Sequence, residues 1–359
     1  MTQTSAARRL LLPFVPLYRL AIGYRELRLR RGWEQVRRLR YPVISVGNLS
    51  TGGSGKTPLT IALARLFTIS GFRVDVLSRG YGRKNDQPAR VRLDGTTEEF
   101  GDEPILIARE AGVPVYVAAQ RYDAGLLAEQ LPDASEESGH DSSRAERRVQ
   151  NEGALVPEQA RLHILDDGFQ HRQLARDIDI LLVDRHDWDD HLLPAGNLRE
   201  ALHAARRASV LAIPADDPAF ESELRDWGWT GPIWRLHRRM EIPVVDGPVG
   251  AFCGIAKPGQ FFDGLRTGGL TLVSQNVFPD HHCYTRRDLQ ALHKSARAAG
   301  ATTLITTEKD HVRLGDIAAA LPESIPVITV PLRVEIEDEA GALEWLTARL
   351  AAGVVNASL

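Results

Sequence analysis

The sequence predicts an α/β protein in which a mostly parallel sheet lies between layers of helices, with a second, smaller α/β domain and an amphipathic N-terminal helix. Three observations indicate this fold. Short β-rich runs alternate with helical patterns, three of these runs are almost wholly apolar, and a second series of strand-and-loop units begins near residue 233. Hydrophobic residues make up 43% of the 359 residues and charged residues 25%, which is typical of a soluble globular protein.

Residues 1–40 form a basic arm. They contain ten arginines and two glutamates, a net charge of +8, whereas the whole chain carries −3 and the remainder therefore −11. A basic arm on an acidic body indicates contact with an anionic surface. Helical spacing places Arg8, Arg19, Glu26 and Arg30 on one face and apolar side chains on the other, namely Leu10, Phe14, Leu17, Tyr18, Ala21 and Tyr24. This pattern favours a helix lying in a membrane interface over one that binds nucleic acid.

The uncharged run of the arm, Leu10–Tyr18, is too short to span a bilayer, because a span needs about 20 apolar residues. Two other interpretations stay open. The helix packs on the protein's own body, or the segment is a signal peptide, although no clear cleavage site follows it.

The first domain is predicted to span residues 41–232. Between its strands, residues 133–157 contain almost no apolar side chains and cannot offset the entropy of ordering them, so we expect a flexible surface insertion there. The expected strands are Val43–Val46, Arg73–Leu77, Val115–Ala118, Leu162–Leu165, Ile178–Val183 and Ser209–Ile213.

The second α/β domain is predicted over residues 233–336. Two β-rich segments at its boundaries, 232–242 and 327–338, are expected to pair as a two-stranded connector. Residues 337–359 are expected to form a helix that returns to the first domain. The two cysteines, Cys253 and Cys283, provide no disulfide framework, which favours a reducing compartment.

A glycine-rich stretch between an expected strand and an expected helix predicts a nucleotide site. It consists of Gly52, Gly53, Ser54, Gly55, Lys56 and Thr57, and we call it the phosphate loop. Glycines allow backbone N–H groups to converge on phosphate oxygens, and the helix N-terminus favours negative charge. Lys56 would reach the β- and γ-phosphates of ATP and Thr57 would bind Mg²⁺. The first domain is therefore expected to be P-loop NTPase-like.

The phosphate loop departs from the general pattern at one position. The glycine that usually stands six residues before the lysine is replaced by Ser50. The alternative is a glycine-rich turn with an exposed lysine, but the order of strand, glycines, Gly-Lys-Thr and helix favours phosphate binding.

Paired carboxylates follow another expected strand. Asp166 and Asp167 come directly after an apolar run, at the carboxyl end of a buried strand, where ligands bind in α/β sheets. A carboxylate at this edge can hold Mg²⁺ directly or through water. The alternative is a turn, because Asp-Gly is common in turns.

Four further residues are candidates with ordinary alternatives. Asp102 precedes a Glu-Pro pair and is equally explained as a helix start. Arg199 and Glu200 are either a phosphate clamp and a metal-side acid or a solvated pair. His281 stands beside Asp280 and is able to orient or relay a proton. The competing interpretation, a metal site formed with His282 and Cys283, lacks further ligands.

Seven motifs occur in one order: VGNLSTGGSGKTP, LSRGYGRK, GDEP, LDDGFQH, LLPAGNLRE, FPDHH and TTEKD. Together they resemble the tetraacyldisaccharide 4'-kinase family, the lipid A disaccharide kinases of Gram-negative bacteria. The family also lacks glycine at the position of Ser50. The insertion at 133–157 departs from the family pattern.

The resemblance implies transfer of the ATP γ-phosphate to the 4'-hydroxyl of a tetraacylated glucosamine disaccharide 1-phosphate, giving lipid IVA. By motif, Asp102 is implied as catalytic base and His281 as its partner. Asp166, Asp167 and Glu200 are implied to hold Mg²⁺ and the phosphates. The two catalytic residues fall in different domains, so we expect domain closure to assemble the site.

The resemblance also implies a peripheral enzyme on the cytoplasmic face of the inner membrane. We expect the membrane surface and the glycolipid as partners, no nucleic acid and no obligatory protein partner. Arg79, Arg83 and Arg199 are candidates for binding the substrate's 1-phosphate. The alternative function is a membrane-associated P-loop switch without a small-molecule acceptor, although no guanine-selecting NKxD run is present.

Overall fold

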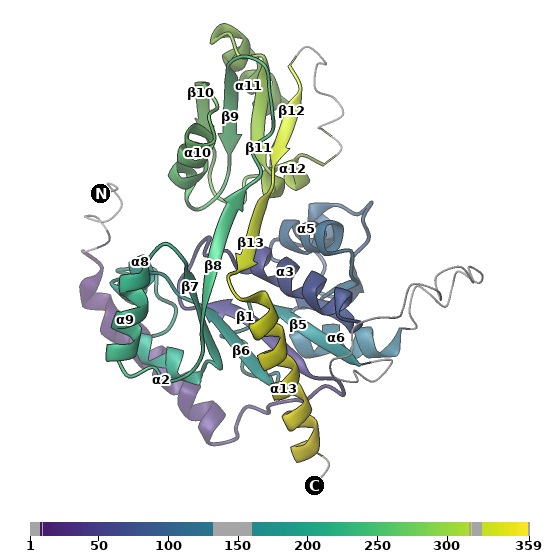
Figure 1. Cartoon of the computed structure of the whole chain (residues 1–359), viewed down its shortest axis with the longest axis vertical. Helices are drawn as coiled ribbons and strands as arrows, with labels where there is room; N and C mark the ends of the chain where they lie inside the picture. The colour runs from purple at the N-terminus through teal and green to yellow at the C-terminus, as the bar shows by residue number, and fades with distance from the viewer. Residues whose placement is uncertain (1–7, 9, 132–159, 316, 318–324, 358–359) are drawn as a thin grey trace, which may run out of the picture.

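The computed structural model describes residues 8, 10–131, 160–315, 317 and 325–357. The predicted insertion at 133–157 lies outside these residues. Two sheets organise the fold: a nine-stranded sheet in the lower body of Figure 1 and a four-stranded sheet above it. This is the mixed α/β architecture that the sequence predicts.

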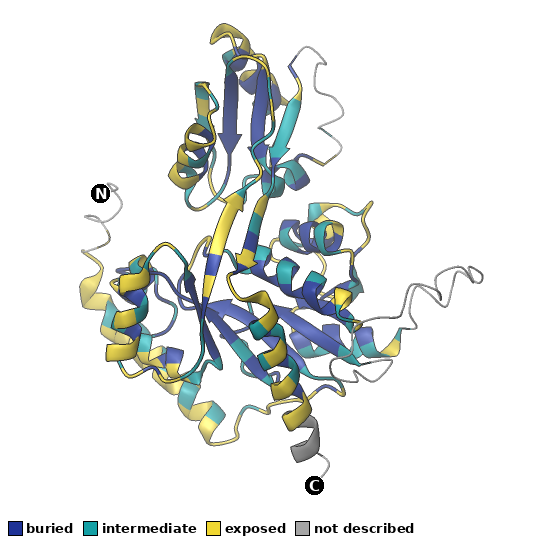
Figure 2. Cartoon of the chain, in the orientation of Figure 1, coloured by how far each residue is buried: buried dark blue, intermediate teal, exposed yellow. Residues whose placement is uncertain are grey.

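The nine-stranded sheet is parallel except for the two pairs at its ends, β13–β8 and β4–β3. Its central strands are buried on both faces, as their apolar runs predict (Figure 2). In spatial order the strands are β13 (Leu332–Ile336), β8 (Ile233–Met240), β7 (Val210–Pro214), β6 (Ile178–Leu182), β1 (Val43–Asn48), β5 (Arg161–Asp166), β2 (Arg73–Ser78), β4 (Val115–Val117) and β3 (Ala89–Arg90).

One face of this sheet is covered by α3 (Lys56–Ile69), α5 (Asp102–Ala111) and α13 (Glu339–Ala357). In α3, Leu59, Leu63 and Phe67 recur at helical spacing and are fully buried. Each such side chain contributes about 1.5–3 kcal/mol relative to exposure. The helix therefore fixes the phosphate loop at the carboxyl end of β1.

The opposite face is covered by shorter elements. They are α6 (Arg121–Gln130), α8 (Arg185–Trp188), the 3₁₀ turn at Leu202–Arg207 and α9 (Pro218–Asp226). A further short helix, α4 (Thr97–Phe100), precedes α5. A capping box between Thr96 and Glu99 stabilises its N-terminus.

The four-stranded sheet is wholly parallel, in the order β10 (Leu272–Val277), β9 (Val249–Cys253), β11 (Thr303–Thr307) and β12 (Val327–Val330). Its side chains alternate between two apolar layers. Phe252 and Leu304 meet α11 (Arg286–Ala298), whereas Ala251 and Ile305 meet α10 (Pro258–Thr267). A short helix, α12 (Glu308–Leu314), follows β11 and buries Val312 in the core of the larger sheet.

Two strands connect the sheets. β8 leads up to β9 and β13 returns from β12, and the two pair antiparallel from Leu332–Met240 to Ile336–Leu236. Both strands belong to the nine-stranded sheet, because β8 also pairs with β7. After β13, helix α13 packs Ala342, Leu346 and Leu350 against the larger core.

The arm contains a 3₁₀ turn (Leu12–Phe14) followed by α2 (Val15–Arg30). One stripe of α2 is half-buried on the body and consists of Val15, Tyr18, Ile22, Glu26 and Leu29. The other apolar side chains stay exposed, among them Leu10, Phe14, Leu17, Leu20, Tyr24 and Leu27.

One face of α2 therefore packs on the body, and the opposite face keeps the exposed apolar side chains that a membrane-interface helix requires. Tyr18, which the helical pattern places with the exposed apolar residues, lies on the body side, and its hydroxyl donates to the Arg199 carbonyl (3.1 Å). Among the described residues, no helix has both the length and the apolar character that a membrane span requires.

Candidate active site

The phosphate loop joins β1 to α3 at the carboxyl edge of the nine-stranded sheet. Gly55, the residue before the helix, has φ of +92°, a conformation that favours glycine. No side chain caps this end of α3 among the described residues, so its first N–H groups are available to an anion, as a site at a helix N-terminus requires. Ser54 Oγ is buried and has no hydrogen-bond partner among the described residues.

Ser50 is buried and its contacts explain why a glycine is not needed there. Its hydroxyl donates to Asp187 Oδ2 (2.8 Å) and accepts from the Asn48 amide (3.1 Å). A β-bridge also pairs Ser50 with Leu198. The serine thus ties the start of the phosphate loop to the LLPAGNLRE segment, which carries Arg199.

Lys56 lies in a cluster of charges rather than on an exposed loop. Its ammonium group is 3.1 Å from Asn48 Oδ1 and 3.5 Å from Asp167 Oδ1, and its side chain is only 12% exposed. Arg199 binds the same carboxylate through two nitrogens, at 2.9 and 3.0 Å. Although burial opposes ionisation, Lys56 and Arg199 hold the pKa of Asp167 well below its usual range.

Asp166 has a different environment from its neighbour. It accepts a hydrogen bond from Thr60 on α3 (3.2 Å) and is almost completely buried. Burial, together with the nearby charges of Glu103 and Asp167, raises the pKa of Asp166 to about 7. A cation bound beside Asp166 would stabilise the ionised form of this carboxyl.

Asp102, the first residue of α5, contacts His281 from the loop after β10 and Arg313 from α12. His281 Nδ1 lies 3.1 Å from its Oδ2, and Arg313 Nε donates to the same oxygen at 2.6 Å. Although burial opposes ionisation, the hydrogen bond to His281 and the charge of Arg313 hold the pKa of Asp102 far below its usual range. The hydrogen bond to Asp102 in turn raises the pKa of His281.

Close packing of two glycine turns positions Asp102. A Cβ on Gly101 would lie 2.9 Å from the Tyr81 carbonyl oxygen, and one on Gly80 would lie 2.8 Å from the Phe100 carbonyl oxygen. Both glycines also have positive φ. The RGYG turn and the start of α5 therefore fit together only without side chains at these two positions.

Backbone strain marks two of the candidate residues. Asp167 (φ +49°) and His281 (φ +58°) are the non-glycine residues with positive φ in the described ranges. This conformation costs about 1–3 kcal/mol per residue and concentrates at functional sites.

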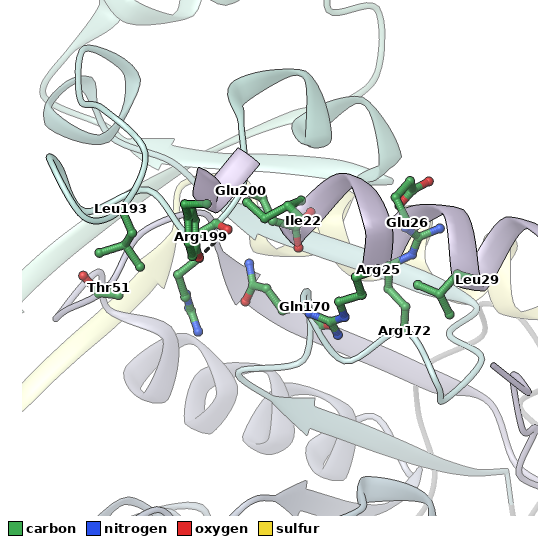
Figure 3. A pocket seen from close by; sticks show the side chains of 11 residues that line it. Ile22, Arg25, Glu26, Leu29, Thr51, Gln170, Arg172, Leu193, Arg199 and Glu200 are labelled. Carbon is green, nitrogen blue, oxygen red and sulfur yellow. Dashed lines mark hydrogen bonds and ion pairs between the residues drawn. The ribbon is translucent and has the colours of Figure 1, made fainter. Parts of the chain in front are cut away.

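The remaining predicted residues surround this centre. Glu200 pairs with Arg207 (2.6 Å) and lines a cavity of about 270 Å³ beneath α2, together with Arg25, Arg172 and Arg199 (Figure 3). Arg83 donates to the carbonyls of Gln87 (2.8 Å) and Val117 (3.4 Å).

The four-stranded sheet and its connectors also contact the first sheet near the phosphate loop. Lys309 pairs with Glu103 (2.5 Å) and Lys257 with Asp184 (3.3 Å). Arg238 of β8 donates to the Ser54 carbonyl. The two halves of the site are thus already joined, and no further closure is needed to bring His281 to Asp102.

A sequence-family model described as Tetraacyldisaccharide-1-P 4'-kinase matches residues 7–351. The chain belongs to this family. A tetraacyldisaccharide 4'-kinase of Koribacter versatilis is 38% identical over 343 residues, which cover 92% of this chain and 96% of that protein. The homologous kinase of Geobacter sulfurreducens is 38% identical over 344 residues, covering 90% and 88% of the two chains.

A solved structure of the family shows the same fold. The "apo" form of LpxK from Aquifex aeolicus in complex with ATP matches with a TM-score of 0.70 and 34% identity, covering 96% of this chain and 99% of that one. The present chain is therefore a kinase of lipid A biosynthesis that uses ATP and phosphorylates a hydroxyl group. These comparisons do not support the alternative of a switch without an acceptor.

The residues at the phosphate loop fit the two expected ligands. Ser54 Oγ is an unpartnered buried group beside the α3 N-terminus, and Lys56 supplies a fixed positive charge. Mg²⁺ is usually bound by one or two carboxylates and keeps phosphate and water ligands. Asp166, Asp167 and the buried Thr57 hydroxyl match that requirement. The described residues contain no group of three or more His, Cys, Asp or Glu side chains that could hold a metal ion.

Three residues near the site escape sequence reasoning. Arg121 is buried and His171 is half-buried, and Arg121 Nε and His171 Nε2 have no hydrogen-bond partner among the described residues. Burial lowers the pKa of Arg121 to about 10 and that of His171 to about 3. Arg313 is the third. His171 lies within a quoted motif, but nothing in the sequence separates Arg121 or Arg313 from surface arginines.

Proposed function

We propose that this kinase transfers the γ-phosphate of ATP to the 4'-hydroxyl of a tetraacylated glucosamine disaccharide 1-phosphate, with Asp102 as the base and His281 as its partner. The contact of 3.1 Å between His281 Nδ1 and Asp102 Oδ2 carries the proposal, because it joins the two sheets at one carboxylate. Phosphoryl transfer needs alignment and charge neutralisation more than covalent help from the protein. An ionised Asp102 accepts the proton of the sugar hydroxyl.

The phosphate loop and its neighbours bind the nucleotide in this proposal. The backbone of Gly52, Gly53, Ser54 and Gly55 surrounds the phosphates, and Lys56 moves from Asp167 to the β- and γ-phosphates. Thr57, Asp166 and Asp167 hold Mg²⁺, which neutralises the charge on the phosphates when it is bound. Glu200 is a further candidate ligand, provided that it exchanges its pairing with Arg207.

Arginines provide the anion-binding part of the acceptor site. Arg79, Arg83 and Arg199 remain candidates for the 1-phosphate, and the buried Arg121 joins them because its Nε has no partner among the described residues. Arg79 and Arg199 are both close enough to Arg121 to influence its pKa. Arg83 would keep its bonds to the backbone carbonyls and contribute its remaining N–H groups.

The exposed face of α2 brings the enzyme to its lipid acceptor. Leucines and aromatic residues on this face, flanked by arginines, suit the boundary between headgroups and acyl chains. The acyl chains then stay in the bilayer while the sugar reaches the site. We place the enzyme on the cytoplasmic face of the inner membrane, as a peripheral protein.

A transfer assay with radiolabelled ATP and the tetraacylated disaccharide 1-phosphate tests this function. Asp102→Ala should lower kcat by about 10²–10⁴-fold and leave ATP affinity within twofold, because the base does not hold the nucleotide. His281→Asn should lower kcat less, and His282→Asn is its matched control, since His282 pairs with Asp288 instead (3.2 Å). Label that reaches only water, or equal losses of kcat and ATP affinity in Asp102→Ala, would refute the proposal.

A further inference from the structure

Arg313 of α12 reaches across from the four-stranded sheet to the proposed base. Its Nε donates to Asp102 Oδ2 at 2.6 Å, and the two side chains are 5% and 6% exposed. A buried ion pair of this kind costs desolvation on both partners, so it is poor evidence for a purely stabilising role. Its position at the base calls for a different explanation.

The two carboxylate oxygens of Asp102 differ in how many hydrogen bonds they accept. A carboxylate oxygen accepts about two hydrogen bonds. Oδ2 already accepts from Arg313 and faces His281 Nδ1 at 3.1 Å. Oδ1 accepts only from the backbone N–H of Glu103 (2.9 Å) within the described part of the chain. One lone pair of Oδ1 is therefore left for a hydroxyl donor.

Hydrogen bonds to Gly254 and Asp310 fix the orientation of Arg313. Its Nη1 donates to the Gly254 carbonyl (2.5 Å) and to Asp310 Oδ1 (3.0 Å). Asp310 is fully buried and also accepts from Tyr284 Oη (3.0 Å) and the Gly254 N–H (3.0 Å). The guanidinium therefore arrives at Asp102 with its orientation fixed by the four-stranded sheet.

The contact between Arg313 and His281 restricts the histidine as well. Arg313 Nη2 lies 3.3 Å from His281 Nδ1, but a guanidinium has no acceptor. If Nδ1 carries the proton that it donates to Asp102, the arginine contact is a repulsion that opposes a second proton on the ring. The charge of Arg313 therefore opposes the doubly protonated histidine, whereas Asp102 favours the proton on Nδ1.

We infer that Arg313 is a positioning residue for phosphoryl transfer: it occupies Asp102 Oδ2 and so leaves Oδ1 as the oxygen that accepts the proton of the sugar hydroxyl. This inference rests on the proposed function, in which Asp102 is the base. In a loose transition state the attacking oxygen has little bonding to phosphorus, so the orientation of its proton matters more than the strength of the base.

Removal of Arg313 changes the pH dependence in a defined direction. The arginine favours ionised Asp102, so its loss raises the pKa of that carboxyl, and a larger fraction is protonated and inactive at low pH. The acidic limb of the kcat/KM profile should therefore move to higher pH. The other charged groups around the contact are unchanged in the variant: His281, Lys309, Glu103, Asp280 and Asp310.

The test compares Arg313→Met, Arg313→Lys and wild type in the transfer assay across the pH range. We expect Arg313→Met to lower kcat by about 10²-fold, to leave the KM for ATP within twofold and to shift the acidic limb. Arg313→Lys should shift the acidic limb less than Arg313→Met does, because a lysine keeps the positive charge. The shift should not vanish, because a lysine lacks the planar group that bonds Asp102 and Gly254 together. Tyr284→Phe removes the hydrogen bond from Tyr284 to Asp310. This variant should show a smaller loss of kcat and a smaller shift of the acidic limb.

Arg333→Met is the matched control, since Arg333 bridges Glu308 of α12 to Glu110 without touching Asp102. Its acidic limb should coincide with that of wild type. An unmoved limb in Arg313→Met, or the same limb shift in Arg333→Met, would overturn the inference. If Asp102→Ala stays inactive in that case, the proposed function survives; if Asp102→Ala is fully active, the function itself fails.

Discussion

Lys56 and Asp167 form an ion pair of 3.5 Å where the phosphate loop meets the end of β5. Arg199 binds the same carboxylate at 2.9 and 3.0 Å. The lysine that should bind ATP is thus held in place by an acid that should bind Mg²⁺. In the proposed function, Lys56 would exchange Asp167 for the nucleotide phosphates, and Asp167 would exchange Lys56 for the metal.

Lys56→Ala should reduce kcat by about 10³-fold, because a fixed positive charge at the transferred phosphate is lost. Arg199 still neutralises Asp167, so the fold should persist and Tm should change by less than about 4 °C. Lys84→Ala is the control, since Lys84 is 73% exposed and pairs only with Glu98 among the described residues. Turnover by Lys56→Ala at near wild-type rates would contradict the assignment.

Charge reversal of Arg79 should raise the KM for the disaccharide 1-phosphate, because a carboxylate there repels the substrate's phosphate. We expect an increase of about tenfold with little change in the KM for ATP. Arg83→Glu should have a comparable effect but also loosen its loop, because Arg83 bonds two backbone carbonyls. Initial rates at varied acceptor concentration measure both. An unchanged acceptor KM in Arg79→Glu would remove this residue from the acceptor site.

The two faces of α2 should respond differently to substitution. Leu17, Leu20 and Leu27 are exposed, so replacing them with serine should weaken binding to vesicles of phosphatidylethanolamine and phosphatidylglycerol while leaving Tm unchanged. Val15→Ser and Ile22→Ser should instead lower Tm, because these side chains pack on the body. Vesicle co-sedimentation and thermal melts distinguish the two. Undiminished vesicle binding after loss of all three leucines would exclude this face as the membrane contact.

His163 links stability to pH at the other end of β5. Its ring is buried between Asp75 (3.5 Å) and Glu129 (3.4 Å). Although burial opposes the charged form, the carboxylates of Asp75 and Glu129 raise the pKa of His163 above its ordinary value. Its stabilising contribution is therefore complete below the unfolded pKa of about 6.5 and is lost as pH rises through the higher, folded pKa.

His163→Gln should consequently cost most stability at mildly acidic pH, and its difference from wild type should narrow as the pH rises. Urea unfolding at a series of pH values measures this difference. The exposed His237, replaced by glutamine, is the control and should show no such trend. A difference from wild type that widens toward alkaline pH would show that the histidine is neutral in the folded protein.

The local elements of the larger sheet follow from the sequence. β1, the phosphate loop and α3 form because a β-branched run, a cluster of glycines and an amphipathic pattern succeed one another within about 25 residues. The same holds for β5 and the aspartates that follow it. These features depend on neighbours along the chain, so residue order alone is enough to predict them. The roles of Asp102 and His281, by contrast, came from the family resemblance and not from their local pattern.

Only the tertiary structure decided which distant side chains meet. The motif places Lys56 beside the phosphates but does not show that Asp167 pairs with it. The helical pattern of α2 likewise does not show which of its faces packs on the body. Arg313 lies 211 residues from Asp102, and its sequence surroundings resemble those of a surface helix. Periodicity reports which face of an element is apolar. It does not report which charges two separate sheets bring within 3 Å, because that depends on how the whole chain packs.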